Sequence, residues 1–182
     1  MTELARNLDE LQNNETIEKR DIVDGIIRDI EAAEYTIAEI NAEKPWGAYI
    51  RIANEDADRF VEEFFPGLTP EEARLGVEGA ELSPKILLVS PHQRLSWQYH
   101  NRRAERWRFL TEGAYKRSET DEEGDVIPAQ VGDVVQFAKG ERHRLIGVDG
   151  QYAIVAEIWQ HVESGQPSNE DDIVRVSDDY NR

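Results

Sequence analysis

From about Leu82 to the C-terminus, apolar residues occur in short runs separated by polar turns, and this pattern constrains the fold more than any other feature. Such runs are typical of β-strands, which need only about four to eight residues to cross a sheet. The expected strands cover 85–89, 95–100, 106–110, 114–118, 133–137, 143–148 and 152–160. Many short strands at close spacing predict an antiparallel barrel or jelly roll.

The residues before Leu82 follow a helical pattern instead. One amphipathic helix is expected to begin near Thr16, and a second to follow Asn54 as its N-cap. A helical turn is expected at Thr69, because Thr-Pro-Glu-Glu has the form of a capping box with proline in the first helical position. The apolar stripe of the first helix consists of Ile17, Ile22, Val23, Ile26, Ile27 and Ile30. Because such a stripe has to be buried, we expect the helices to pack outside the β structure.

The chain of 182 residues has the length of one domain. Residues 1–15 are polar and are expected to form a flexible lead-in. Residues 16–80 are expected to form a helical N-terminal extension, and residues 81–182 a barrel with a C-terminal tail. The sequence therefore predicts a single, mainly β domain with N-terminal α-helices packed outside.

Charge and composition exclude several classes of protein. With 38 Asp and Glu against 21 Lys and Arg, the formal net charge is −17, so we expect neither nucleic acid nor a membrane as partner. The chain has no cysteine, which excludes disulfides, a thiolate nucleophile and Cys-ligated metals. No apolar run is long enough for a signal peptide or a membrane span, and the expected location is the cytoplasm.

One segment is basic in this acidic chain. Residues 85–117 contain eight Lys or Arg against Glu105 and Glu112, which gives a local charge of +6. The segment is either a solvated pair of strands or the mouth of a site for a small anionic molecule. The second interpretation rests on the chemistry of arginine, because a guanidinium group can donate two parallel hydrogen bonds to the oxygens of one phosphate or carboxylate.

The same segment contains a candidate metal site. Gln98 and His100 lie two positions apart on an expected strand, so their side chains leave the same face. A turn over 101–104 would bring Glu105 beside them, and His143 follows in a later segment. One amide oxygen, two imidazoles and one carboxylate suit Zn, Mn, Fe, Co or Ni, with positions left for water or substrate. Each residue alone could equally be an ordinary, partly buried polar side chain.

Two segments partly match the motifs of the cupin superfamily. The second cupin motif has the form G-x5-P-x-G-x2-H-x3-N, and residues 132–147 keep its spacing with Ala138 and Gly147 at the proline and asparagine positions. The first has the form G-x5-H-x-H-x(3,4)-E-x6-G, and here Gln98 replaces its first histidine. The chain thus resembles the cupins, whose fold is a double-stranded β-helix or jelly-roll barrel. This resemblance implies one divalent ion, with zinc expected first and Mn, Co, Ni or Fe as alternatives. The implied ligands are Gln98, His100, Glu105 and His143.

Three longer segments resemble one cupin family, the type II mannose-6-phosphate isomerases. They are 44–49 (Lys-Pro-Trp-Gly-Ala-Tyr), 95–107 with three of the four expected ligands, and the tail 170–182 (Glu-Asp-Asp-Ile-Val-Arg and onward). Arg102 and Arg106 replace two histidines of the family pattern. Many members also carry a nucleotidyltransferase domain, which we do not expect here, so the expected unit is the isomerase alone.

The resemblance implies a metal-dependent aldose–ketose isomerase. It would interconvert a phosphorylated sugar, such as mannose 6-phosphate and fructose 6-phosphate, through an enediolate. Arg103 and Lys85 are expected to act in catalysis and in substrate binding, and Arg175 in substrate binding. The options for the base are Glu157 and a metal-bound hydroxide.

Alternative interpretations accompany this hypothesis. Arg175 could pair with Asp171 or Asp178 and only hold the tail in place. The arginines at 102 and 106 fit a non-catalytic cupin that contains metal and acts in sugar binding or regulation. The third hypothesis, after the isomerase and the non-catalytic cupin, is an oxygenase that uses iron. A homodimer is a possible assembly.

Overall fold

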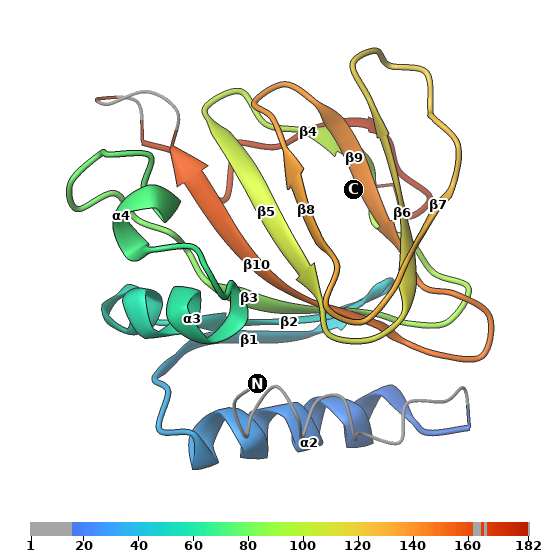
Figure 1. Cartoon of the computed structure of the whole chain (residues 1–182). Helices are drawn as coiled ribbons and strands as arrows, with labels where there is room; N and C mark the ends of the chain where they lie inside the picture. The colour runs from blue at the N-terminus through green and yellow to red at the C-terminus, as the bar shows by residue number, and fades with distance from the viewer. Residues whose placement is uncertain (1–15, 162–164, 166, 182) are drawn as a thin grey trace.

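The computed structural model describes residues 16–161, 165 and 167–181, so the lead-in expected over 1–15 lies outside the described residues. Two antiparallel sheets form the body of the protein (Figure 1). The first sheet has the order β1 (Ile37–Lys44), β2 (Gly47–Ile52), β3 (Lys85–Val89), β10 (Ala153–His161), β5 (Arg103–Phe109) and β8 (Val134–Phe137). The second has the order β11 (Val174–Ser177), β4 (Trp97–Tyr99), β9 (Arg142–Ile146), β6 (Gly113–Ser118) and β7 (Ile127–Ala129). The expected jelly roll is confirmed, as an open sandwich of two sheets in the part of the chain described.

The expected strands all have counterparts, but the helical extension expected over 16–80 is wrong in one respect. Strands β1 and β2 lie within it and form a hairpin at the edge of the first sheet. In β2 the side chains of Ala48, Ile50 and Ile52 are buried, while those of Tyr49 and Arg51 on the opposite face are half-buried. This alternation is a strand pattern, but β1 has no fully buried residue and gives no comparable signal.

The helices pack on the outer face of the first sheet, as expected. They are α2 (Lys19–Ala32), the 3-10 turn η1 (Asn54–Asp56), α3 (Ala57–Phe64) and α4 (Pro70–Ala73). Figure 1 shows α2 running along the β1–β2–β3 side of the sheet. Ile22, Ile26 and Ile30 on α2 belong to the same buried cluster as Ile50 and Ile86 of the sheet. None of the helices in the described part of the chain is long and apolar enough to cross a bilayer.

The two expected helix caps have different outcomes. The capping box at Thr69 is confirmed, because its hydroxyl accepts a hydrogen bond from Glu72 N (3.2 Å) and its own N donates to the Glu72 carboxylate (2.9 Å). Asn54 is not an N-cap. It opens η1, and its Oδ1 accepts a hydrogen bond from Leu82 N (3.0 Å), which ties the helical segment to the chain entering β3.

A second apolar cluster fills the space between the two sheets, and β10 separates it from the outer cluster. Ile154, Ala156 and Ile158 belong to the outer cluster, and Val155 to the inner one. Because side chains alternate along a strand, the next residues on the inner side after Val155 are Glu157 and Trp159. The strand thereby places a carboxylate in the interior of the sandwich.

The docking of α2 generates a stability prediction. Replacing Ile26, which is completely buried, with alanine should lower the free energy of unfolding by about 2 to 5 kcal/mol, because it removes apolar contacts and leaves a cavity. Arg28 lies on the exposed face of the same helix, and Arg28→Ala should change the free energy of unfolding by less than about 0.5 kcal/mol. Urea unfolding monitored by circular dichroism measures both values. Equal stability of the two variants would contradict the docking of α2 on the sheet.

Candidate functional site

Three ligand-type side chains meet between the sheets. His100 directly follows β4, Glu105 lies on β5 and His143 on β9. His100 Nε2 is 3.0 Å from Glu105 Oε1, and His143 Nε2 is 3.1 Å from Glu105 Oε2. Candidate ligand atoms of the three residues lie within 4.8 Å of one another, and all three side chains are buried. The structure therefore brings together three of the four residues expected as ligands, and this cluster could hold a metal ion.

The two imidazoles are oriented in the way that metal binding requires. His100 Nδ1 faces the carbonyl oxygen of Asp172 (2.5 Å), and His143 Nδ1 faces that of Glu141 (3.0 Å). A carbonyl oxygen only accepts, so both Nδ1 atoms carry a proton. Burial lowers the pKa of His100, which favours its neutral form. Its Nε2 lone pair then faces the Glu105 carboxylate, an arrangement that a cation between them would stabilise.

The C-terminal tail positions this cluster through Asp172. The buried Asp172 carboxylate accepts hydrogen bonds from the backbone N atoms of Asn101 (2.9 Å) and Arg102 (3.0 Å), in the turn between β4 and β5. Its carbonyl oxygen accepts hydrogen bonds from His100 Nδ1 and Arg103 Nη1. One tail residue thus fixes both the turn and the side chains that flank Glu105. We did not expect this role, although Asp172 lies within the tail motif.

Gln98, the fourth expected ligand, lies on β4 with its Cα paired to that of His143 on β9. Its side chain is buried and lines the same pocket as Glu105, and its Oε1 accepts a hydrogen bond from Ser96 Oγ (2.6 Å). Its role as a metal ligand stays a prediction.

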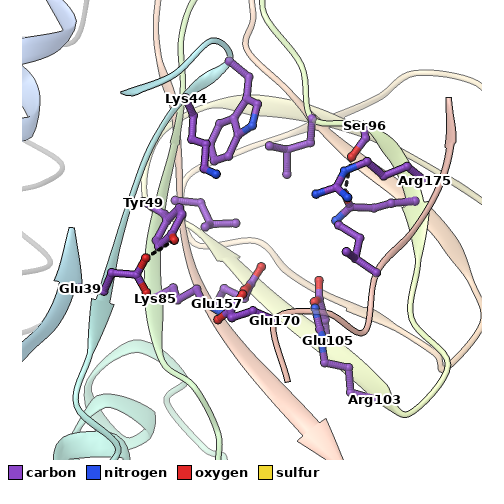
Figure 2. Close-up of a pocket in the computed structure, with 15 residues that line it drawn as sticks. Glu39, Lys44, Tyr49, Lys85, Ser96, Arg103, Glu105, Glu157, Glu170 and Arg175 are labelled. Carbon is purple, nitrogen blue, oxygen red and sulfur yellow. Dashed lines mark hydrogen bonds and ion pairs between the residues drawn. The ribbon is translucent and has the colours of Figure 1, made fainter. Parts of the chain in front are cut away.

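A pocket of about 310 Å³ opens beside the cluster (Figure 2). Its charged wall residues are the cations Lys44, Lys85, Arg103 and Arg175 and the acids Glu39, Glu105, Glu157 and Glu170. All the residues expected to act in catalysis or substrate binding therefore line one pocket. Arg102 and Arg106, which replace histidines of the family pattern, are not among its wall residues.

Glu157 is the acid in this pocket whose pKa lies near neutral pH. Its Oε2 accepts a hydrogen bond from Trp107 Nε1 (2.9 Å), and its Oε1 lies 3.7 Å from Lys85 Nζ. Burial and the nearby charge of Glu105 raise its pKa to about 7, against the smaller opposing effects of Lys85 and Arg103. A carboxylate with this pKa can both accept and return a proton near neutral pH.

Arg103 is a buried cation with most of its donors engaged inside the protein. Its Nε donates to Glu105 Oε1 (2.9 Å), and its Nη1 donates to Ser168 Oγ (2.8 Å) and to the carbonyl oxygens of Asn169 and Asp172 (3.1 Å each). The guanidinium also lies 3.9 Å from the centre of the Trp159 ring. This geometry fixes the carboxylate of Glu105 firmly.

Comparison with known proteins connects this site to a family. Residues 76–178, more than half of the chain, match the family model described as mannose-6-phosphate isomerase C-terminal. No curated protein matches the sequence significantly.

Solved structures show similarity of fold only, because the sequence identities are low. A variant of Bacillus subtilis oxalate decarboxylase OxdC is 14% identical over 75% of this chain and 30% of its own, with a TM-score of 0.50. The capsular polysaccharide assembling protein CapF from Staphylococcus aureus is 12% identical over 86% of this chain and 37% of its own, with a TM-score of 0.49. A Cupin 2 conserved barrel domain protein from Salinispora arenicola is 16% identical over 69% of this chain and 83% of its own, with a TM-score of 0.45. The chain thus spans about a third of the length of the first two.

The family match includes β4, β5 and β9, which carry the cluster of His100, Glu105 and His143, and the tail that supports it. The chain belongs to the family of the mannose-6-phosphate isomerase C-terminal domain, a family of cupins.

Proposed function

We propose that this protein is a metal-dependent aldose–ketose isomerase that acts on a phosphorylated sugar such as mannose 6-phosphate. The observation that carries the proposal is the position of Glu157, a buried carboxylate with a pKa of about 7, in the pocket that Glu105 also lines. The reaction needs one group that takes a proton from C2 and returns it to C1, and a positive charge near the two oxygens. The pocket offers a residue for the first requirement and a donor set for the second.

The proposed ligands are Gln98, His100, Glu105 and His143. Zinc is the first candidate for the metal, because two of these ligands are imidazoles. A divalent ion held there would keep about one unit of positive charge beside the single carboxylate, which stabilises negative charge developing on the substrate oxygens.

The chain's own residues would carry out the proton transfer. Glu157 in its carboxylate form takes the C2 proton, the electron pair of the broken C–H bond forms a C1=C2 double bond, and the electron pair of the C1=O bond moves onto the C1 oxygen to give an enediolate. The proton of the C2 hydroxyl moves to the C1 oxygen, and protonated Glu157 returns its proton to C1, which leaves a hydroxyl group at C1 and the carbonyl group at C2. Lys85 and Trp107 hold the two oxygens of Glu157, and Arg103 holds Glu105. In this proposal Arg103 and Lys85 act chiefly by positioning these carboxylates beside the substrate.

The donor set generates a prediction about metal content. Protein purified without chelator should contain about one equivalent of a divalent metal, because the two imidazoles and the carboxylate lie close enough together to hold one ion. The double variant His100→Ala, His143→Ala should lose it, while His92→Ala, at an exposed histidine that is not part of the cluster, should keep it. Elemental analysis of the three proteins measures this. Full metal content in the double variant would exclude the site.

Turnover tests the activity itself. Metal-replete protein should convert mannose 6-phosphate to fructose 6-phosphate in a coupled assay, lose this activity with EDTA and regain it with added metal. If the protein converted neither mannose 6-phosphate nor heptose and other hexose phosphates, but still bound sugars, it would be a sugar-binding or regulatory cupin instead.

The pKa of Glu157 predicts the pH dependence of the reaction. A base must be deprotonated, so kcat/KM should rise by about tenfold per pH unit at low pH and level off above the pKa of about 7. Glu157→Gln should lower kcat at least about a hundredfold and abolish this limb, that is, the rise of kcat/KM with pH. The matched control is Glu63→Gln, whose carboxylate also bonds an aromatic side chain, Tyr35 (2.7 Å), but does not line the pocket. An unchanged limb in Glu157→Gln would exclude this residue as the base.

A further inference from the structure

One side of the pocket carries polar groups that the proposed proton transfer does not use. We propose that Lys44 and the indole N–H of Trp46 form a subsite for the phosphate group of the substrate. The proposal rests on the proposed function for the identity of the sugar phosphate, but phosphate binding itself can be measured without turnover.

Lys85 and Arg103 are poor candidates for a phosphate site, because the protein already neutralises them. Lys85 Nζ lies 3.0 Å from Glu170 Oε1 and 3.7 Å from Glu157 Oε1. Arg103 is paired with Glu105 and bonded to the tail. Releasing either cation for a phosphate would leave a buried carboxylate without its partner, which is costly.

Trp46 supplies a donor without an acceptor. Its side chain is only 6% exposed and lines the pocket, yet no acceptor within the described residues lies in hydrogen-bonding reach of Nε1. A buried N–H without a partner costs free energy, and native structures rarely tolerate it outside functional sites. An anionic oxygen of a ligand in the pocket would satisfy this donor.

Lys44 supplies the positive charge beside this donor. It ends β1, two residues before Trp46, and Figure 2 shows its side chain directed into the pocket with Arg175 on the opposite side. The structure places no carboxylate within ion-pair distance of Lys44 in the chain segments it describes. Glu39, another wall residue, is already bonded to Tyr49 and lies 3.4 Å from Arg51 Nε. The ammonium group of Lys44 and the indole N–H of Trp46 would each bind one anionic oxygen of a phosphate.

The turn that carries Lys44 and Trp46 is fixed before any ligand arrives. Lys19 Nζ on α2 donates to the carbonyl oxygens of Ala42 (2.7 Å), Lys44 (3.3 Å) and Gly47 (3.4 Å). Gly47 has φ +153° and approaches β3 so closely that a Cβ would lie 1.9 Å from a backbone oxygen. Such preorganisation lowers the entropic cost of binding a ligand.

Phosphate binding by the metal-replete, full-length protein tests the subsite directly. We expect Lys44→Met and Trp46→Phe each to raise the Kd for inorganic phosphate, measured by calorimetry, by about tenfold. The KM for mannose 6-phosphate should rise by a similar factor with kcat little changed, and the affinity for unphosphorylated mannose should stay the same. Lys44→Arg should retain most of the affinity, and Lys139→Met, a lysine outside this pocket, should bind phosphate like the wild type. Thermal melts establish that each variant is folded.

The outcomes separate this proposal from the proposed function. If both variants bind phosphate and mannose 6-phosphate as tightly as the wild type, the subsite is wrong even if the protein is an isomerase. If the wild type binds no phosphate and no sugar phosphate, the subsite is equally excluded. If Lys44→Met and Trp46→Phe weaken phosphate binding but no sugar phosphate is turned over, the subsite stands and the proposed isomerase activity fails.

Discussion

The buried carboxylate of Glu105 is the interaction on which the arrangement of this site depends. A carboxylate removed from water needs compensating charge and hydrogen bonds, and here both come from side chains at three strands. Arg103 reaches it from the same strand, His100 from the end of β4 and His143 from β9. The hydrogen bonds of Asp172 to the β4–β5 turn then fix the direction from which His100 and Arg103 approach. The position of the strands and the chemistry of the site are therefore coupled through one charged group.

The sequence predicts the first part of this site, Gln98, His100 and Glu105, because these residues lie close together in the chain. Gln98 and His100 are two residues apart, so a strand pattern alone predicts that their side chains leave the same face, and a short turn then leads the chain to Glu105. The part played by Asp172 could not be predicted in the same way, since its partners Asn101 and Arg102 lie 71 and 70 residues away in the chain. Its contribution depends on where the tail docks, which no local pattern encodes.

The same distinction explains the other differences between expectation and structure. Glu157 could be named as an option for the base from its strand, but its raised pKa comes from burial beside Glu105, which only the packed sheets determine. The β1–β2 hairpin was missed because β1 is polar and has no buried face. That hairpin is nevertheless part of the pocket, and through Lys19 the first helix holds it in place. The N-terminal segment thus contributes to the walls of the site as well as to the stability of the outer core.

The tail that supports the site is attached less extensively than the sheets it touches. Strand β11 pairs only with β4 among the described strands, three of its four residues are exposed, and Arg94 anchors the following segment through Asp179 (2.6 Å). Segments with few buried contacts open at a lower free energy than the core. The tail, including the edge strand β11, should therefore detach in local opening events while the other strands of both sheets stay paired, and each event would remove Asp172 from the β4–β5 turn. Amide hydrogen exchange at Asn101 and Arg102, whose N–H groups Asp172 binds, would then report how often the site is intact.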